Sequence, residues 1–191
     1  MFQVAEGLAP CVLWIDELEK VFAGSGPDWA SVDAGVSSRI LAAFLGWMQE
    51  RKAPAFVAAT CNNVTALPPE LIRKGRFDEL FFVDLPNQSE REKIFAIQLN
   101  RRKRNPSEFD LDRIAAAAKG HSGAEIDAAV QTALYAAYTS KQPLTTQALL
   151  DALKATVSLS TTRAEEIQGL REWAKTRAVA ASVADARAEG A

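Results

Sequence analysis

The stretch Pro10-Cys11-Val12-Leu13-Trp14-Ile15-Asp16-Glu17 decides the fold that we expect for this chain. The run from Cys11 to Ile15 has no polar alternation, which is typical of a strand buried on both faces inside a parallel sheet. Asp16 and Glu17 follow where that strand ends, at the sheet edge where ligands bind in such folds. Such a pair suits phosphate chemistry, because one carboxylate can hold Mg²⁺ and the other can polarise a water. Acidic residues in the first turn of the next helix would give the same pattern.

Length and composition favour an ordinary soluble globular protein. The chain has 191 residues, of which 48% are hydrophobic and 24% charged, and this is enough apolar material for a core. The net charge of −2 gives no reason to expect nucleic acid or a membrane surface as a partner. No signal peptide or membrane-length apolar run is present, so we expect a cytoplasmic location. Cys11 and Cys61 are expected to be buried thiols, and His121 alone cannot build a metal site or a triad.

Strands and helices alternate in the first part of the sequence. The residues before Pro10 suit the end of an amphipathic helix. Apolar residues at helical spacing predict a helix from Gly35 to Arg51, and the prolines at Pro68-Pro69 favour the start of another. Further buried strands are predicted at Ala55–Cys61 and, shorter, at Leu80–Val83. This alternation predicts an α/β protein with a parallel sheet.

The sequence after residue 86 is predicted to be entirely helical, without a further strand. Ser89 is the expected N-cap of the first of these helices. The basic run Arg101-Arg102-Lys103-Arg104 is interpreted as a solvated helix end, where cations suit the helix dipole, in preference to an anion site. The tail after Ala180 is expected to fray. The helices are expected at about residues 89–102, 110–118, 122–139, 145–156 and 162–178.

Three further features complete a candidate constellation. Asn62 follows the second long strand, where its amide could hold a water or a phosphate oxygen, although such an Asn is usually a turn residue. Arg73 and Arg76 lie in a short connection and suit a phosphate whose charge is moving, although loop arginines more often form surface salt bridges. Ser122 is a plausible N-cap, and Gly123-Ala124 would allow close approach of a flat ligand, or the segment is simply a capped helix.

Together these motifs resemble an AAA-type (AAA+) ATPase over residues 1 to about 157. The resemblance implies an α/β fold, a partial AAA+ P-loop NTPase parallel sheet followed by an all-α helical lid. It implies a C-terminal part of the α/β subdomain at residues 1–86, a lid at 87–157, and a C-terminal helix and tail at 158–191. Leu13-Trp14-Ile15 and the final part of the chain further resemble the AAA proteins of cyanobacteria, plastids and many proteobacteria, whose role is poorly defined. The motifs are Cys11–Glu17, Ala59–Asn62, Leu67–Asp78 and Ser122–Ile126.

The resemblance also implies a role for each matching residue, with ATP and Mg²⁺ as the cofactors. Asp16 and Glu17 match the Walker B pair, Asp16 for Mg²⁺ and Glu17 for activating water. Asn62 matches sensor 1. Arg73 and Arg76 match the arginine fingers, which in this family act on ATP bound by the neighbouring subunit and therefore imply self-assembly into a ring, usually a hexamer.

Other positions match less completely. Gly123 and Ala124 match the lid segment that packs near adenine. Gln98 stands where many relatives place a histidine near the nucleotide, and this departure puts that contact in doubt. The loop around Gly24-Ser25-Gly26 would face the central pore.

The phosphate-binding loop G-x-x-x-x-G-K-[ST] is absent from this sequence, and the family places it upstream of the first residue here. Without it the phosphates lose their backbone N–H cradle and their lysine. The same missing part would remove two strands, leaving a gap between the strand that ends at Asn62 and the strand at Phe81-Phe82. We therefore expect the isolated chain to bind ATP weakly or not at all and to self-associate.

The sequence thus predicts the C-terminal portion of an AAA+ ATPase that hydrolyses ATP in a ring to remodel protein partners. The client cannot be identified from the residues. The alternative is a non-catalytic interaction module that supplies Arg73 and Arg76 to a full-length partner. A remnant without a role is a third possibility. The portion of an active ATPase is favoured because Asp16, Glu17, Asn62, Arg73 and Arg76 are all retained.

Overall fold

The computed structural model describes residues 2–22, 34–50, 52–73 and 75–182. Contacts divide the chain into two compact units, residues 1–79 and residues 80–191. The predicted parts 1–86, 87–157 and 158–191 stay a prediction. The Gly24-Ser25-Gly26 loop lies outside the described residues.

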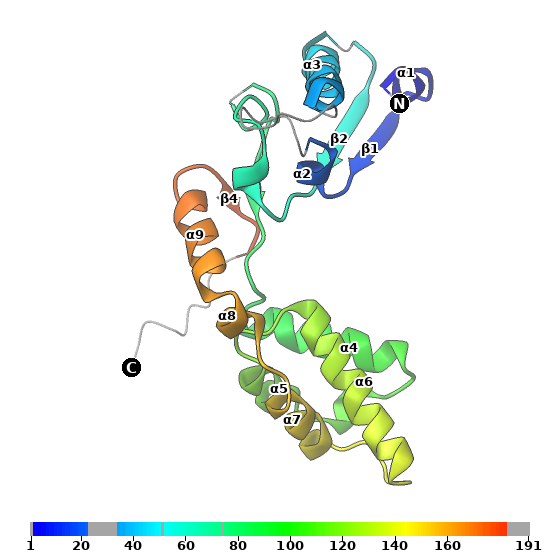
Figure 1. Cartoon of the computed structure of the whole chain (residues 1–191). Helices are drawn as coiled ribbons and strands as arrows, with labels where there is room; N and C mark the ends of the chain where they lie inside the picture. Colours follow the sequence, from blue (N-terminus) through cyan, green and yellow to red (C-terminus); the bar gives the residue numbers. More distant parts are fainter. Residues whose placement is uncertain (1, 23–33, 51, 74, 183–191) are drawn as a thin grey trace. The chain divides into compact units, whose positions relative to one another are not determined.

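The first unit is built on two parallel strands with helices beside them (Figure 1). In the register of these strands, Cys11 lies opposite Ala55 and Ile15 lies opposite Ala59. The helix predicted before Pro10 and the long helix after the loop are both present. The elements are α1 (Phe2–Gly7), β1 (Cys11–Ile15), α2 (Leu18–Val21), α3 (Ala34–Glu50), β2 (Ala55–Ala59) and a short 3-10 helix (Val64–Ala66).

One face of the β1–β2 pair packs on the core of this unit and the other face does not. Phe44 of α3 is fully buried in that core, and its ring lies 5.5 Å from that of Phe2. On the opposite face, Val12, Trp14 and Phe56 are 67%, 62% and 68% exposed. The prediction that the strands are buried on both faces is therefore wrong for this chain, because the described helices contribute to a core on one side only. The buried residues of the core are Ile15, Leu18, Phe22, Phe44, Leu67 and Leu71.

The helix predicted to begin at Pro68-Pro69 does not form within the described residues. This segment consists of turns, one of which is closed by the Leu71 N–H donating to the Pro68 carbonyl oxygen at 3.0 Å. Gly75, which has a φ of +90°, follows soon after, and a left-handed residue ends any helix there. Buried Leu67 and Leu71 fix the turns to the core instead.

The second unit contains a helical bundle (Figure 1). The four main helices occupy the predicted positions and share a core whose central members are fully buried: Phe95, Leu99, Ile114, Ile126, Val130 and Leu149. No helix in the described part of the chain is both long and apolar enough to cross a membrane. The elements are α4 (Gln88–Arg101), a 3-10 helix (Pro106–Glu108), α5 (Leu111–Ala117), α6 (Gly123–Thr139), α7 (Thr146–Lys154), α8 (Leu159–Thr162) and α9 (Ala164–Ala174).

Side-chain caps fix where the bundle helices begin. Asn87, not Ser89, caps α4: its side chain accepts the Glu90 N–H, and the Glu90 carboxylate accepts the Asn87 N–H. This reciprocal pair satisfies two backbone donors at once, whereas the residue three positions after Ser89 is not part of such a pair. Ser122 is the N-cap of α6, as predicted, and forms a second capping box with Glu125.

The segment after α7 contains a strand that the sequence did not predict. β4 (Val179–Ala180) pairs in parallel with β3 (Phe81–Phe82), and the Val179 N–H donates to the Leu80 carbonyl oxygen at 2.8 Å. The helix predicted at about 162–178 is present as the shorter α9 (Ala164–Ala174), and the short α8 (Leu159–Thr162) precedes it. The expectation that no strand follows residue 86 is therefore wrong, because a free strand edge can be paired by a segment too short to show alternation.

Candidate functional site at the strand ends

Thr60 joins the carboxyl ends of β1 and β2. Its hydroxyl donates to Asp16 Oδ1 and accepts the Glu17 N–H at 3.0 Å. Its backbone N–H donates to the Ile15 carbonyl oxygen at 2.9 Å, and its carbonyl oxygen accepts the Leu18 N–H at 2.8 Å. The predicted carboxylate pair is thus fixed to the neighbouring strand by one residue. The sequence reading did not single out Thr60, although its position directly after a strand parallel to β1 was the available signal.

Glu17 has an unusual backbone conformation. Its φ of 51° and ψ of 57° are left-handed, and α2 begins at the next residue. This conformation is uncommon for residues other than glycine and costs about 1–2 kcal/mol. The Glu17 carboxylate pairs with Lys20 at 2.7 Å, and this hydrogen bond raises the pKa of Lys20. Because the ammonium is exposed, the ion pair is weak and leaves the Glu17 carboxylate available to a ligand.

Glu19 connects the turn after β1 to the segment after β2. Its Oε1 accepts the Asn62 N–H at 3.1 Å. Burial acts to raise the pKa of Glu19, but hydrogen bonds from backbone N–H groups, including that of Asn62, outweigh burial and lower the pKa. The Asn62 side chain is exposed and has no hydrogen-bond partner among the described residues. Asn62 therefore has a fixed backbone and an available amide.

The two cysteines are not the buried pair that we expected. Cys11 is half-buried and donates to the Ala5 carbonyl oxygen at 3.2 Å, and Cys61 is exposed. Cys61 follows the end of β2, where nothing in the described structure covers it fully. Partial burial, together with a hydrogen bond to the Glu19 carboxylate and its charge, raises the pKa of the Cys61 thiol to about 11. The thiol is thus protonated at neutral pH and unsuited to nucleophilic chemistry.

The two predicted arginines have different surroundings. Arg73 is exposed, whereas Arg76 is half-buried and its Nη1 donates to Gln49 Oε1 of α3 at 3.0 Å. Within the described structure neither arginine forms a hydrogen bond or ion pair with Asp16 or Glu17. The carboxylate pair and the arginines are therefore not joined by direct bonds within the first unit.

The remaining predicted residues, Gln98, Gly123 and Ala124, lie in the second unit. Gln98 Oε1 accepts from Arg102 Nη1 at 3.0 Å, and Arg102 Nη2 pairs with Asp127 Oδ1 of α6 at 2.7 Å. A Cβ at Gly123 would lie 3.8 Å from Ile94 Cδ1 of α4, so α6 begins close to α4. Gln98 is thus bonded to Arg102 at the end of its own helix, and Arg102 in turn joins α4 to α6.

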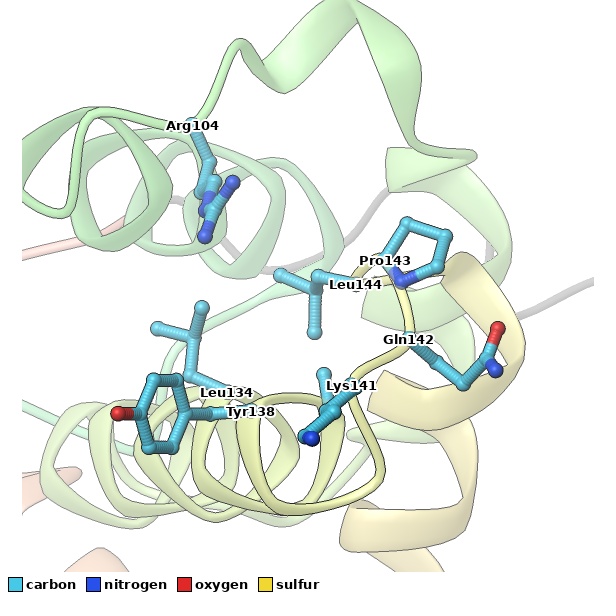
Figure 2. Close-up of a pocket in the computed structure, with 8 residues that line it drawn as sticks. Arg104, Leu134, Tyr138, Lys141, Gln142, Pro143 and Leu144 are labelled. Carbon is cyan, nitrogen blue, oxygen red and sulfur yellow. The ribbon is translucent and has the colours of Figure 1, made fainter.

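Two hollows of the second unit contain none of the predicted site residues. One has a volume of about 360 Å³. Figure 2 shows Arg104 on one side of it and Leu134, Tyr138 and Lys141 together on the opposite side. A second, of about 740 Å³, lies among β3, β4, α8 and the loop before α6. The candidate site is defined by the polar groups at the strand ends.

Asp16 and Thr60 are compatible with Mg²⁺. Both are oxygen donors, and Mg²⁺ in nucleotide sites is usually bound by one or two carboxylates, water and substrate phosphates. The described residues contain no group of three or more His, Cys, Asp or Glu side chains able to hold a metal by themselves. A single carboxylate with a neighbouring hydroxyl thus suits a metal that arrives with a phosphate ligand.

Known sequences that are similar to this chain include AAA proteins. Residues 1–85 match the family model described as "ATPase family associated with various cellular activities (AAA)". Over 175 residues, 91% of this chain, the sequence is 41% identical to the uncharacterized AAA domain-containing protein ycf46 of Pyropia yezoensis and 42% identical to that of Guillardia theta. The chain spans 35% and 34% of those relatives, about a third of their length.

Solved structures show the same fold. The AAA domain of FIGL-1 in complex with ADP superposes with a TM-score of 0.71 at 19% identity, covering 93% of this chain and 61% of that domain. The predicted fold class, a partial AAA+ P-loop NTPase fold, is therefore confirmed. The chain is thus similar to AAA ATPases over residues 1–85 by the family model and over 91% of its length by the sequence comparison, and the solved structures show the same fold.

Proposed function

We propose that this chain is the C-terminal portion of an AAA+ ATPase that hydrolyses ATP in a ring and remodels protein partners. The observation that carries the proposal is the bonding of Thr60 to both members of the Asp16–Glu17 pair, at the carboxyl ends of neighbouring parallel strands. This is the edge of the sheet at which α/β folds bind ligands. The ADP complex of FIGL-1 supports a nucleotide as that ligand.

Each residue of the strand ends has a proposed role. Asp16, beside the Thr60 hydroxyl, would hold Mg²⁺, which when bound neutralises charge on the phosphates. Glu17 would orient and polarise the attacking water, which its exposed carboxylate allows. The free amide of Asn62 would hold that water or a γ-phosphate oxygen. Gln98, Gly123 and Ala124 would contribute to the nucleotide site from the helical unit.

Arg73 and Arg76 are proposed to act on ATP held by a neighbouring copy. Exposed Arg73 forms no ion pair among the described residues, and Arg76 is held to α3 through Gln49. A permanent positive charge with a planar fork suits a phosphoryl group in its transition state. This arrangement would require a ring, which we propose is a hexamer. The cytoplasmic location stays a prediction.

One alternative rests on a specific observation. The sequence contains no G-x-x-x-x-G-K-[ST], and without such a loop a chain has no backbone cradle for the phosphates. The chain could then serve as a non-catalytic module that supplies Arg73 and Arg76 to a full-length partner. An in-frame phosphate-loop segment encoded upstream would argue against this alternative.

The test is ATP hydrolysis by the 191-residue chain, by the chain with an N-terminal segment carrying the phosphate loop, and by Glu17→Gln in the extended form. We expect hydrolysis only by the extended form, and a loss of about 10²–10⁴-fold in kcat on Glu17→Gln. Glu6→Gln is the matched control, because Glu6 lies in α1 and accepts a hydrogen bond from Trp47 at 3.1 Å.

Each outcome has a defined meaning. An inactive extended chain with a native circular dichroism spectrum would favour the non-catalytic module. Hydrolysis by the 191-residue chain alone would show that the phosphate loop is dispensable and would refute our view of its absence. Equal losses in Glu17→Gln and Glu6→Gln would remove Glu17 from the chemistry.

A further inference from the structure

The ends of β1 and β2 are joined by two separate side-chain links. The first is the Thr60 hydroxyl, bonded to Asp16 and to the Glu17 N–H. The second is Glu19, whose Oε1 accepts the Asn62 N–H at 3.1 Å. Of the residues in these links, only Asp16, Glu17 and Asn62 have a role in the proposed function, and none is assigned to Glu19.

We propose that Glu19 is a positioning residue that sets the place of Asn62 relative to Glu17. The inference rests on the proposed function, in which Glu17 and Asn62 act on the same water. Glu19 is two residues from Glu17 along the chain, and its carboxylate reaches the backbone of Asn62 directly. Any shift of the turn after β1 is therefore transmitted to the segment after β2.

The surroundings of Glu19 distinguish it from an ordinary surface acid. Its Oε2 is buried and has no hydrogen-bond partner among the described residues, although a buried carboxylate oxygen is costly to leave unpaired. Lys20, which follows it, forms its ion pair with Glu17, so Glu19 is not committed to a surface salt bridge.

Thr60 and Glu19 hold different atoms of the site, so each constrains a group that the other leaves free. Thr60 fixes the Asp16 carboxylate and the left-handed backbone of Glu17. Glu19 fixes the backbone from which the Asn62 amide extends. With only the first link, Asn62 could move with its exposed loop. Groups that act on one water must be held to within about 0.5 Å of their working geometry, which a second link provides.

The first experiment measures the bond itself in the 191-residue chain. Glu19→Ala removes the acceptor, whereas Glu19→Gln keeps an oxygen there, and Glu6→Ala is the control in α1. We expect hydrogen exchange of the Asn62 amide, followed by NMR, to accelerate about tenfold or more in Glu19→Ala and to change less than about threefold in the other two. Unchanged exchange in Glu19→Ala would overturn the proposal.

The last experiment separates positioning from binding in the chain extended with a phosphate-loop segment. Glu19→Ala should lower kcat about tenfold and change KM less than about twofold, with Glu19→Gln recovering most of kcat. An unchanged kcat would refute the positioning role. If the extended chain without substitutions fails to hydrolyse ATP, the proposed function is lost, while the amide exchange still decides whether Glu19 holds Asn62.

Discussion

The two units of the chain differ in how completely each buries its own apolar side chains. In the helical unit, Phe95 and Ile126 are fully buried, and the bundle helices begin at side-chain caps such as Asn87 and Ser122. In the strand unit, one face of the β1–β2 pair is exposed. The groups proposed for chemistry lie in this less complete unit. Local signals are thus enough to specify the four main helices of the helical unit, whereas the strand unit depends on links between distant segments.

The substitution with the largest expected effect tests whether the two units unfold independently. Phe95→Ala should destabilise the helical unit by about 3–5 kcal/mol, because it removes a buried ring from a filled core. Hydrogen exchange read by mass spectrometry in increasing urea should then show earlier loss of protection in α4 to α7, with β1 and β2 unchanged. Phe44→Ala is the reciprocal variant, since Phe44 is the fully buried ring of the strand unit.

A common response of both units to either variant would contradict the division of the chain into two independent units. If protection in β1 and in α6 is lost at the same urea concentration in both variants, the chain unfolds as one cooperative body. The exposed face of β1 and β2 would then say nothing about the stability of that unit. Separate transitions, each moved by its own variant, would support the division.

A smaller effect concerns how the C-terminal segment attaches within the helical unit. Gly120 has a φ of +83°, and a Cβ there would lie 2.1 Å from Ser160 Oγ. Gly120→Ala should therefore cost about 1–3 kcal/mol of unfolding free energy, measured by urea titration. Gly169→Ala is the matched control: nothing lies within 4 Å of that Cβ, and alanine inside α9 should stabilise by up to about 1 kcal/mol.

The steric part of this effect can be isolated. Adding Ser160→Gly to Gly120→Ala removes the atom that the new Cβ would meet, so it should recover part of the loss and leave the cost of the positive φ. If Gly120→Ala and Gly169→Ala change stability with the same sign, the packing of α8 against the α5–α6 loop does not matter to this unit.

The sequence predicted best what depends on near neighbours. The helices α5, α6 and α7 were placed within a few residues, because apolar spacing and caps such as Ser122 act over a few positions. Asp16 and Glu17 were proposed as a carboxylate pair because they follow directly after a predicted strand, and β1 is present at that position. Helix positions and caps, which depend on residues a few positions apart, could therefore be predicted from the sequence.

Features that depend on distant segments were missed. Thr60 meets Asp16 across 44 residues and Glu19 meets Asn62 across 43, and no local pattern marks either bond. β4 is too short to show alternation, so only its pairing with β3 reveals it as a strand. The exposure of Trp14 likewise depends on what covers the sheet, and its apolar neighbours in sequence suggested the opposite. Pairing and coverage are tertiary properties that one-dimensional patterns do not contain.

The smallest expected effect concerns the ion pair between Asp84 and Arg171 in the helical unit. Arg171 Nε and Nη2 donate to Asp84 Oδ2 and Oδ1 at 2.8 and 2.9 Å, a two-point geometry that strengthens such pairs. Both side chains are more than a third exposed, at 41% and 36%. A double-mutant cycle with alanine should therefore give a coupling of about 0.5–1 kcal/mol that shrinks between about 0.05 and 0.5 M salt.

The pair of Arg163 with Glu166 is the control, because it makes a single contact at 3.4 Å and is 63% and 67% exposed. Its coupling should be close to zero. Equal couplings for the two pairs would mean that the two-point geometry adds nothing. If instead loss of Arg171 also accelerates exchange of the Val179 amide, which donates to Leu80, then the ion pair and the β3–β4 pairing form one cooperative element. The helical unit would then depend on a link between distant segments, as the strand unit does.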